Sequence, residues 1–301
     1  NIPPHNLGEV VDGLLVLLDN PEISIEELMQ IIKAPDFPTK GFLYGLSGLR
    51  SAYTSGRGSF KIRGKVSVEE RQRGLESLVI NEIPYALNKS NLVERIAQLI
   101  NEKKIEGVSD LRDESDRNGI RIVLDLKKGI LPDIIINKLY KFTALETSFG
   151  VNLLAVVNNR PKLLNLKEIL ELFLEHRKEV ILRRSRYDLR KAEQRAHILE
   201  GLRIALDNID EVVSIIRASK SPVEAKQSLM QRFELSETQS QAILDMRLQR
   251  LTNMEREKIL EEYTEILKKI EYLNSILGNY EVLKGVVREE LNELRKNYST
   301  P

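Results

Sequence analysis

One segment of the sequence combines basic residues with a strand pattern, and it is the clearest candidate for a binding site. Between Phe37 and Val68 there is no Asp or Glu, although 45 of the 301 residues are acidic. Residues 59–68 alternate between polar and apolar types, which predicts one half-buried strand with its cations on a single face. A row of cations beside the flexible Gly56-Arg57-Gly58 suits a nucleic-acid phosphate backbone, and a merely solvated strand face is the alternative. The basic residues of the segment are Lys40, Arg50, Arg57, Lys61, Arg63 and Lys65.

A second candidate is the apolar step at the start of the chain, Ile2-Pro3-Pro4-His5-Asn6. An isoleucine held by two prolines suits a wedge between base steps, because such side chains unstack bases and kink a duplex. The alternative is a hydrophobic staple, in which Ile2 packs on the helix that follows. No second metal ligand lies near His5 in the sequence, so we interpret it as a loop or capping residue.

We find no convincing motif for catalysis or metal binding. The acidic run that starts at Glu114 resembles a calcium loop, but residues 120–126 alternate as a strand where that loop requires a helix. Asn118-Gly119 therefore predicts a tight turn. Tyr187 follows an arginine, yet it lies inside a long helical pattern. The absence of Cys excludes disulfides, thiol catalysis and Cys-ligated zinc.

The composition limits the partners and the location. Lys and Arg (46) nearly balance Asp and Glu (45), so binding to a polyanion must be local. The lack of Cys fits a reducing compartment, and we expect a cytoplasmic protein. No apolar run approaches the ~20 residues of a membrane span, so we expect no membrane contact. The first residue is Asn rather than Met, which suggests a piece of a longer protein.

The elements that position these candidates predict a helix-rich α+β fold. Six capping residues stand three places before Glu or Gln and predict helix starts: Asn6, Ser24, Asn165, Ser221, Ser236 and Thr252. We expect a helical linker over 1–37 and a domain of alternating strands and helices over 38–160. A strand over 75–83, a helix over 88–101, a helix over 132–142 and an extended segment over 147–157 fill that domain.

After Pro161 the apolar spacing changes to heptads, which predicts long arms over 161–217 and 252–297. A helix from Leu166 to Ile216, weakened locally at Gly201, would pair antiparallel with a second one. A compact head over 218–251 would join them. The two seams are Leu199, Leu202, Leu206, Ile209, Val213 and Ile216, and Ile259, Tyr263, Ile266, Ile270, Leu273 and Leu277.

Taken together, six segments in order resemble the A subunits of DNA gyrase, the DNA-breaking subunits of bacterial type IIA topoisomerases. They span nearly the whole chain, and their shared order is what makes the signal strong. The segments are Asn1–Val10, Gly56–Arg63, Asn81–Tyr85, Leu111–Asp116, Arg195–Glu200 and Gln241–Thr252.

The resemblance implies roles for the candidates. Residues 38–160 would form the family's tower domain beside the cleaved duplex, and the long helices would form a coiled coil. Ile2 matches the family's intercalating isoleucine, and Arg57, Lys61, Arg63 and Lys65 would contact double-stranded DNA. The head would be the exit gate of a homodimer, with contacts from Gln241, Ile243, Leu244, Met246, Leu248 and Leu251.

The resemblance also implies the activity of the parent enzyme, which is ATP-dependent supercoiling through phosphotyrosine links to broken DNA. In the family the nucleophilic tyrosine lies in an upstream winged-helix domain, so we expect this chain to hold no catalytic residue and to be inactive alone. Mg²⁺ and ATP would bind through the gyrase B subunit, the partner in an A2B2 complex, and no cofactor would bind here. The alternatives are the A subunit of topoisomerase IV, which decatenates DNA, and a non-enzymatic coiled-coil scaffold.

Overall fold

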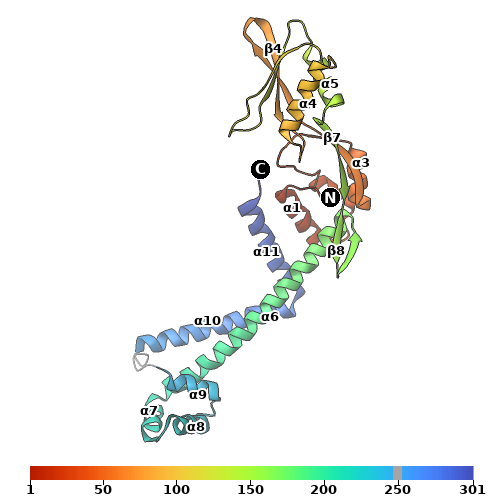
Figure 1. The fold of residues 1–301 in the computed structure, drawn as a ribbon. Helices are drawn as coiled ribbons and strands as arrows, with labels where there is room; N and C mark the ends of the chain where they lie inside the picture. Colours follow the sequence, from red (N-terminus) through yellow and green to blue (C-terminus); the bar gives the residue numbers. More distant parts are fainter. Residues whose placement is uncertain (247–252, 301) are drawn as a thin grey trace. The chain divides into compact units, whose positions relative to one another are not determined.

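The structure is a computed structural model that describes residues 1–246 and 253–300 (Figure 1). It divides into two compact units. One contains residues 1–173 and the C-terminal residues from Leu291, and the other contains residues 174–290. Within the described part of the chain, no helix is both long enough and apolar enough to cross a membrane.

The N-terminal helices of the first unit start at the predicted caps. Helix α1 (Leu7–Asp19) is capped by Asn6, and α2 (Ile25–Ile31) begins with a capping box formed by Ser24 and Glu27. These bonds satisfy backbone N–H groups that the first helical turn leaves without partners. The two helices bury an apolar cluster that includes Leu14, Leu17, Leu28 and Ile32.

A three-stranded antiparallel sheet follows, in the order β1-β2-β7. Its strands are β1 (Phe42–Tyr44), β2 (Arg57–Arg63) and β7 (Glu146–Asn152). Helix α3 (Leu46–Ser55) packs on β2 at very short range, because a Cβ on Gly48 would lie 1.8 Å from the Ser59 carbonyl oxygen. Glycine is therefore required at this helix–strand contact. The hairpin of β8 (Leu154–Val157) and β9 (Arg160–Leu163) continues the chain.

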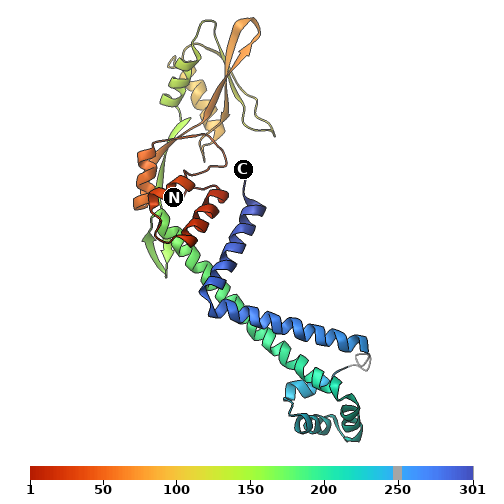
Figure 2. The ribbon, with the colours of Figure 1, turned by 180° about the vertical axis from the view of Figure 1, so that it is seen from behind.

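A second antiparallel sheet has the order β3-β4-β6-β5. Helices α4 (Lys89–Asn101) and α5 (Pro132–Phe142) lie next to each other on one face of it (Figures 1 and 2). The predicted strand over 75–83 and both predicted helices are confirmed, and Asp116 and Gly119 close the predicted turn at Asn118-Gly119. The strands are β3 (Lys65–Arg71), β4 (Leu75–Glu82), β5 (Val108–Asp113) and β6 (Ile122–Leu126), with a 3-10 turn over Gln72–Gly74.

The prediction of one continuous strand over 59–68 is wrong. The chain breaks at Gly64, so β2 and β3 belong to different sheets. Gly64 is buried, its N–H donates to the Leu145 carbonyl at 2.9 Å, and an added Cβ would lie 2.4 Å from the Glu82 carbonyl oxygen. Polar and apolar residues continue to alternate across Gly64. The polar residues before and after it nevertheless lie on different sheets and do not form one surface.

In the second unit, two long helices run antiparallel. Helix α6 (Leu166–Asp207), which enters the unit at Leu174, pairs with α10 (Asn253–Gly278). Arg195 donates two hydrogen bonds to Glu262, at 2.7 and 2.8 Å, and Arg256 donates to Asp207 at 2.6 Å. The predicted seam of the second helix is confirmed, because all six of its residues are buried or half-buried.

Two details of the predicted arms are wrong, and Gly201 has a role that the sequence did not indicate. The first long helix ends at Asp207 rather than Ile216, and α7 (Ile209–Ala218) buries Val212 while Ile216 is exposed. Gly201 is a contact point, since an added Cβ would lie 2.7 Å from Cβ of Gln239. The second arm is two helices, because α11 (Tyr280–Tyr298) begins after Asn279, whose side chain accepts the N–H of Glu281.

The head contains α8 (Pro222–Phe233) and α9 (Glu237–Leu244), which begin at the predicted caps Ser221 and Ser236. Pro222 occupies the first helical turn, where its missing N–H removes no hydrogen bond. Thr252, the remaining predicted cap, lies outside the described residues. The core of the head joins α6 to α7, α8 and α9 through buried aliphatic side chains, including Leu199, Leu202, Val212, Leu229 and Leu235.

Candidate nucleic-acid interface

The two faces of β2 differ sharply in chemistry. Phe60 and Ile62 are fully buried, and Phe60 stacks on Phe149 of β7 at 5.6 Å between ring centroids. On the other face, Arg57 and Lys61 are exposed and Arg63 is half-buried. The alternation predicted from the sequence is thus confirmed for β2, where it produces an apolar side and a basic side. We call the basic side, with its neighbours on β1 and β7, the basic face.

Two aromatic residues, which the sequence reasoning missed, belong to the basic face. The antiparallel register places Tyr44 opposite Lys61 and Phe42 opposite Arg63. Their exposed fractions are 46% and 49%, and the Arg63 guanidinium lies 4.3 Å from the Tyr44 ring centroid. The signal was present as two aromatics at alternate positions inside the acid-free segment. Stacked guanidinium and aromatic groups are common in surfaces that contact nucleic acid.

One acid reaches the basic face from a distant part of the sequence. Glu146 of β7 lies directly opposite Arg63, accepts a hydrogen bond from Lys61 Nζ at 2.6 Å and accepts another from Arg63 Nε. The bond from Lys61, followed by that from Arg63, lowers the pKa of Glu146 although burial opposes this. Arg57, Lys61 and Arg63 against this carboxylate leave two net positive charges.

Arg57 and Lys65 differ in how they relate to this face. Arg57 is exposed, and within residues 1–246 and 253–300 no ion pair holds its side chain. The prediction that Lys65 shares a face with Lys61 and Arg63 is wrong, because Lys65 begins β3 of the other sheet, opposite Glu82. Its side chain is exposed, and the Glu82 carboxylate accepts the N–H of Gly41 at 2.7 Å instead.

The N-terminal step is anchored to the Arg57 end of the basic face. Asn1 and Asn152 exchange two backbone hydrogen bonds, at 3.0 and 3.2 Å, and Asn152 lies opposite Arg57 in the register. Pro3 is buried, but the Ile2 side chain is 54% exposed. A hydrophobic staple would be more fully packed, so this exposure favours the wedge alternative. An exposed aliphatic side chain lies at the same end of the sheet as an exposed arginine.

This surface carries what bending of a duplex requires, namely cations for phosphates and an apolar side chain for a base step. Comparison with known proteins gives the family, because residues 1–292 match the family model that describes the A subunit of DNA gyrase/topoisomerase IV. The chain belongs to this family. The resemblance identified from the six segments is confirmed.

Individual members of the family are similar over the whole length of this chain. The DNA gyrase A subunit of Lawsonia intracellularis is 60% identical over 301 residues, which cover 100% of this chain and 37% of that protein. The Clostridium acetobutylicum protein of the same name is 55% identical over 298 residues, covering 99% of this chain and 36% of the relative. The chain therefore spans little more than a third of the length of these relatives.

In the family context, the head residues predicted for the dimer gate differ in their exposure. The prediction for Ile243 is wrong, because its side chain is 2% exposed and lies in the head's own core. Leu244 and Met246 are half-buried against the same core, whereas Gln241 is exposed and donates to Asp245 at 3.1 Å. Leu248 and Leu251 lie outside the described residues.

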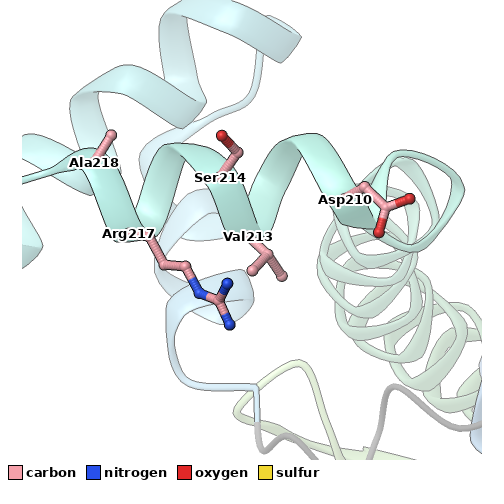
Figure 3. A pocket seen from close by; sticks show the side chains of 5 residues that line it. All are labelled: Asp210, Val213, Ser214, Arg217 and Ala218. Atoms are coloured by element: carbon pink, nitrogen blue, oxygen red, sulfur yellow. The ribbon is translucent and has the colours of Figure 1, made fainter.

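A hollow on the head does not resemble a ligand site. Its volume is about 630 Å³, and its five lining residues all belong to α7, namely Asp210, Val213, Ser214, Arg217 and Ala218. Figure 3 shows Val213 and Arg217 on one side of the helix and Ser214 and Ala218 on the other, so the side chains do not converge. Convergent polar groups are what a small-molecule site needs.

Tyr187 has no catalytic surroundings within the described structure. Its side chain is exposed on α6, with Arg190 and Lys191 at 5.6 and 5.8 Å from the ring. Nor do residues 1–246 and 253–300 gather three or more His, Asp or Glu side chains that could hold a metal ion.

Proposed function

We propose that this chain forms the DNA-bending surface and the exit gate of a DNA gyrase A subunit. In this proposal the parent enzyme breaks and rejoins duplex DNA through phosphotyrosine links and changes supercoiling in an ATP-dependent manner. The observation that carries the proposal is the placement of exposed Ile2 beside Arg57, at one end of a face that also carries Lys61 and Arg63.

Each group on this surface has a distinct task. Arg57, Lys61 and Arg63 neutralise phosphates, which gives affinity without reading sequence. Ile2 enters a base step and unstacks it, so that the duplex kinks. Bending a site costs on the order of 1–6 kcal/mol, and the phosphate contacts on both sides of the kink must offset that cost.

The remaining parts of the proposal concern the assembly. Two copies form a C2 homodimer, which presents two wedges and two basic faces to one duplex. The heads meet at the exit gate, with Gln241, Leu244 and Met246 near the contact, and release the second duplex. The attacking tyrosine belongs to a part of the parent protein outside residues 1–301. Mg²⁺ and ATP are held by the partner B subunit, and no residue of this chain takes part in that chemistry.

The decisive experiment replaces the wedge in a full-length A subunit that carries these residues, assembled with its B subunit. Ile2→Ala should abolish DNA bending measured by FRET and reduce cleavage, because the base step is no longer unstacked. Val223→Ala is the matched control, since Val223 is an aliphatic residue on α8 with comparable exposure, 62% against 54% for Ile2. Normal bending by the Ile2→Ala enzyme would refute the wedge.

Two competing functions are separated by other measurements. A topoisomerase IV enzyme would decatenate linked circles efficiently and introduce no negative supercoils. A coiled-coil scaffold would bind duplex DNA only weakly and would not bend it, since such a protein has no use for the basic face. Neither alternative is favoured by a specific contact among the described residues.

A further inference from the structure

His5 joins the N-terminal step to the helix that supports the basic face. Its ring Nδ1 lies 2.9 Å from the Pro3 carbonyl oxygen and its Nε2 lies 2.7 Å from the Tyr53 hydroxyl. Tyr53 is buried in α3, three residues before the Gly56 that leads into Arg57. The two rings are 5.8 Å apart between centroids. One imidazole thus contacts both parts of the proposed DNA site.

The contacts determine which ring nitrogen carries the proton. A carbonyl oxygen only accepts, so Nδ1–H must donate to Pro3. In the neutral imidazole Nε2 is then the acceptor, and the Tyr53 hydroxyl donates to it. Burial lowers the pKa of His5, although the Pro3 bond and nearby Asp36 oppose this, and burial raises the pKa of Tyr53 with a contribution from Glu9. Both groups are therefore in the required protonation states at neutral pH.

The wedge has few other supports among the described residues. The Ile2 side chain is 54% exposed, so packing restrains it only in part. Its backbone is fixed upstream by Asn1 and downstream by the Pro4 carbonyl, which accepts the N–H of Asp36 at 2.9 Å. The Pro3 carbonyl, between these points, is held by His5. A site needs such supporting bonds because a side chain displaced by about 1 Å loses its productive geometry.

We propose that His5 is a positioning residue, whose neutral imidazole clamps the Ile2-Pro3 step to Tyr53 and so keeps the wedge at a constant distance from the cations of β2. The clamp rests on the proposed function of Ile2 as the DNA wedge. It makes the wedge and Arg57 one rigid element, since Tyr53 and Arg57 are both tied to α3.

Protonation should weaken the clamp. With a proton on Nε2 the ring can only donate to the Tyr53 oxygen, so the hydroxyl hydrogen must turn away and the buried O–H loses its acceptor. Because the pKa of His5 is lowered from 6.5, the clamp is intact above that pH and weakens as pH falls through the folded-state pKa. Asp36 from the loop after α2, Glu9 of α1 and Tyr53 of α3 are the titratable groups that act on the pair.

The test uses a full-length A subunit with its B subunit and a duplex carrying 2-aminopurine at the unstacked step. Tyr53→Phe and His5→Leu each remove the clamp and should reduce the unstacked fraction about fivefold, the effect of losing one hydrogen bond. His5→Gln keeps a donor and an acceptor and should restore most of the signal. The salt slope of duplex binding should be unchanged in all three, whereas general damage to the fold would flatten it.

The pH profile gives a second readout. Unstacking by the unmodified enzyme should fall only as pH is lowered below 6.5, through the lowered folded-state pKa of His5, while the His5→Gln enzyme should show no such step. If Ile2→Ala abolishes unstacking but Tyr53→Phe and His5→Leu do not change it, the clamp is overturned and the wedge stands. If Ile2→Ala leaves unstacking intact, the proposed function itself fails.

Discussion

The three-stranded and four-stranded sheets of the first unit both carry arginines on an exposed surface, but only one of them is a candidate for binding DNA. On the larger sheet Arg112 donates to Asp125 at 2.6 Å and to Asp110 at 2.7 Å, and Arg121 donates twice to Glu69, at 2.8 and 2.7 Å. On the basic face the cations outnumber the acid that reaches them. A count of basic residues therefore does not identify a binding surface, whereas the balance of charges within contact distance does.

The buried Asp125 explains why arginines of the larger sheet are held in ion pairs within the protein. Its side chain is only 4% exposed and accepts hydrogen bonds from Arg112 and, at 2.7 Å, from Ser77, with Arg71 at 3.1 Å. Burial alone would raise the pKa of Asp125, yet the bonds from Arg112 and Ser77 lower it. Here the arginines stabilise an internal carboxylate, and a phosphate would have to displace it.

The largest effect should come from removing cations of the basic face. Arg57→Ala with Lys61→Ala should weaken duplex binding on the order of tenfold and uniformly across sequences, reducing the salt slope by about 2. Arg112→Ala with Arg121→Ala is the matched control and should leave the slope unchanged. Binding titrations at several salt concentrations measure both, and equal slopes for the two double variants would contradict the assignment.

Removing the carboxylate of Glu146 should strengthen DNA binding, whereas removing the cations weakens it. Glu146→Gln frees Lys61 and Arg63 from their ion pairs, so duplex affinity should rise about fivefold and the salt slope should steepen. Glu114→Gln, which removes an acid that contacts Arg112 and Arg121 on the larger sheet, is the control and should change neither quantity. Weaker binding by the Glu146→Gln variant would show that the ion pairs position the cations and do not compete with phosphate.

The smallest effect on DNA should come from Asp125→Asn. This variant leaves Arg71 and Arg112 without their buried anion, so the free energy of unfolding should fall by ~1–3 kcal/mol at neutral pH while duplex binding is unchanged. The folded-state pKa of Asp125 is lowered from 3.8, so its contribution is present above that pH and is lost as pH falls further. Denaturant unfolding should thus show that the free energies of unfolding of the unmodified protein and of the Asp125→Asn variant become equal at acid pH.

Local chemistry explains which features were predictable. Five predicted caps, from Asn6 to Ser236, start helices because each bond joins residues three apart. The strand pattern of β2 was also readable, since alternation acts within a few residues. The break at Gly64 was not readable. Polar and apolar residues alternate across it, and only the neighbouring Leu145 and Glu82 backbones require glycine there.

The sequence alone determined the helix starts, the acid-free segment and the resemblance to gyrase A subunits, because these depend on residue order over short distances. The tertiary structure decided which cations an acid reaches. Glu146 is 83 residues away from Arg63 along the chain but opposite it in the sheet. It likewise brought Ile2 beside Arg57 and His5 onto Tyr53. Electrostatic and hydrogen-bond energies depend on distance in space, which is set only when distant strands pair.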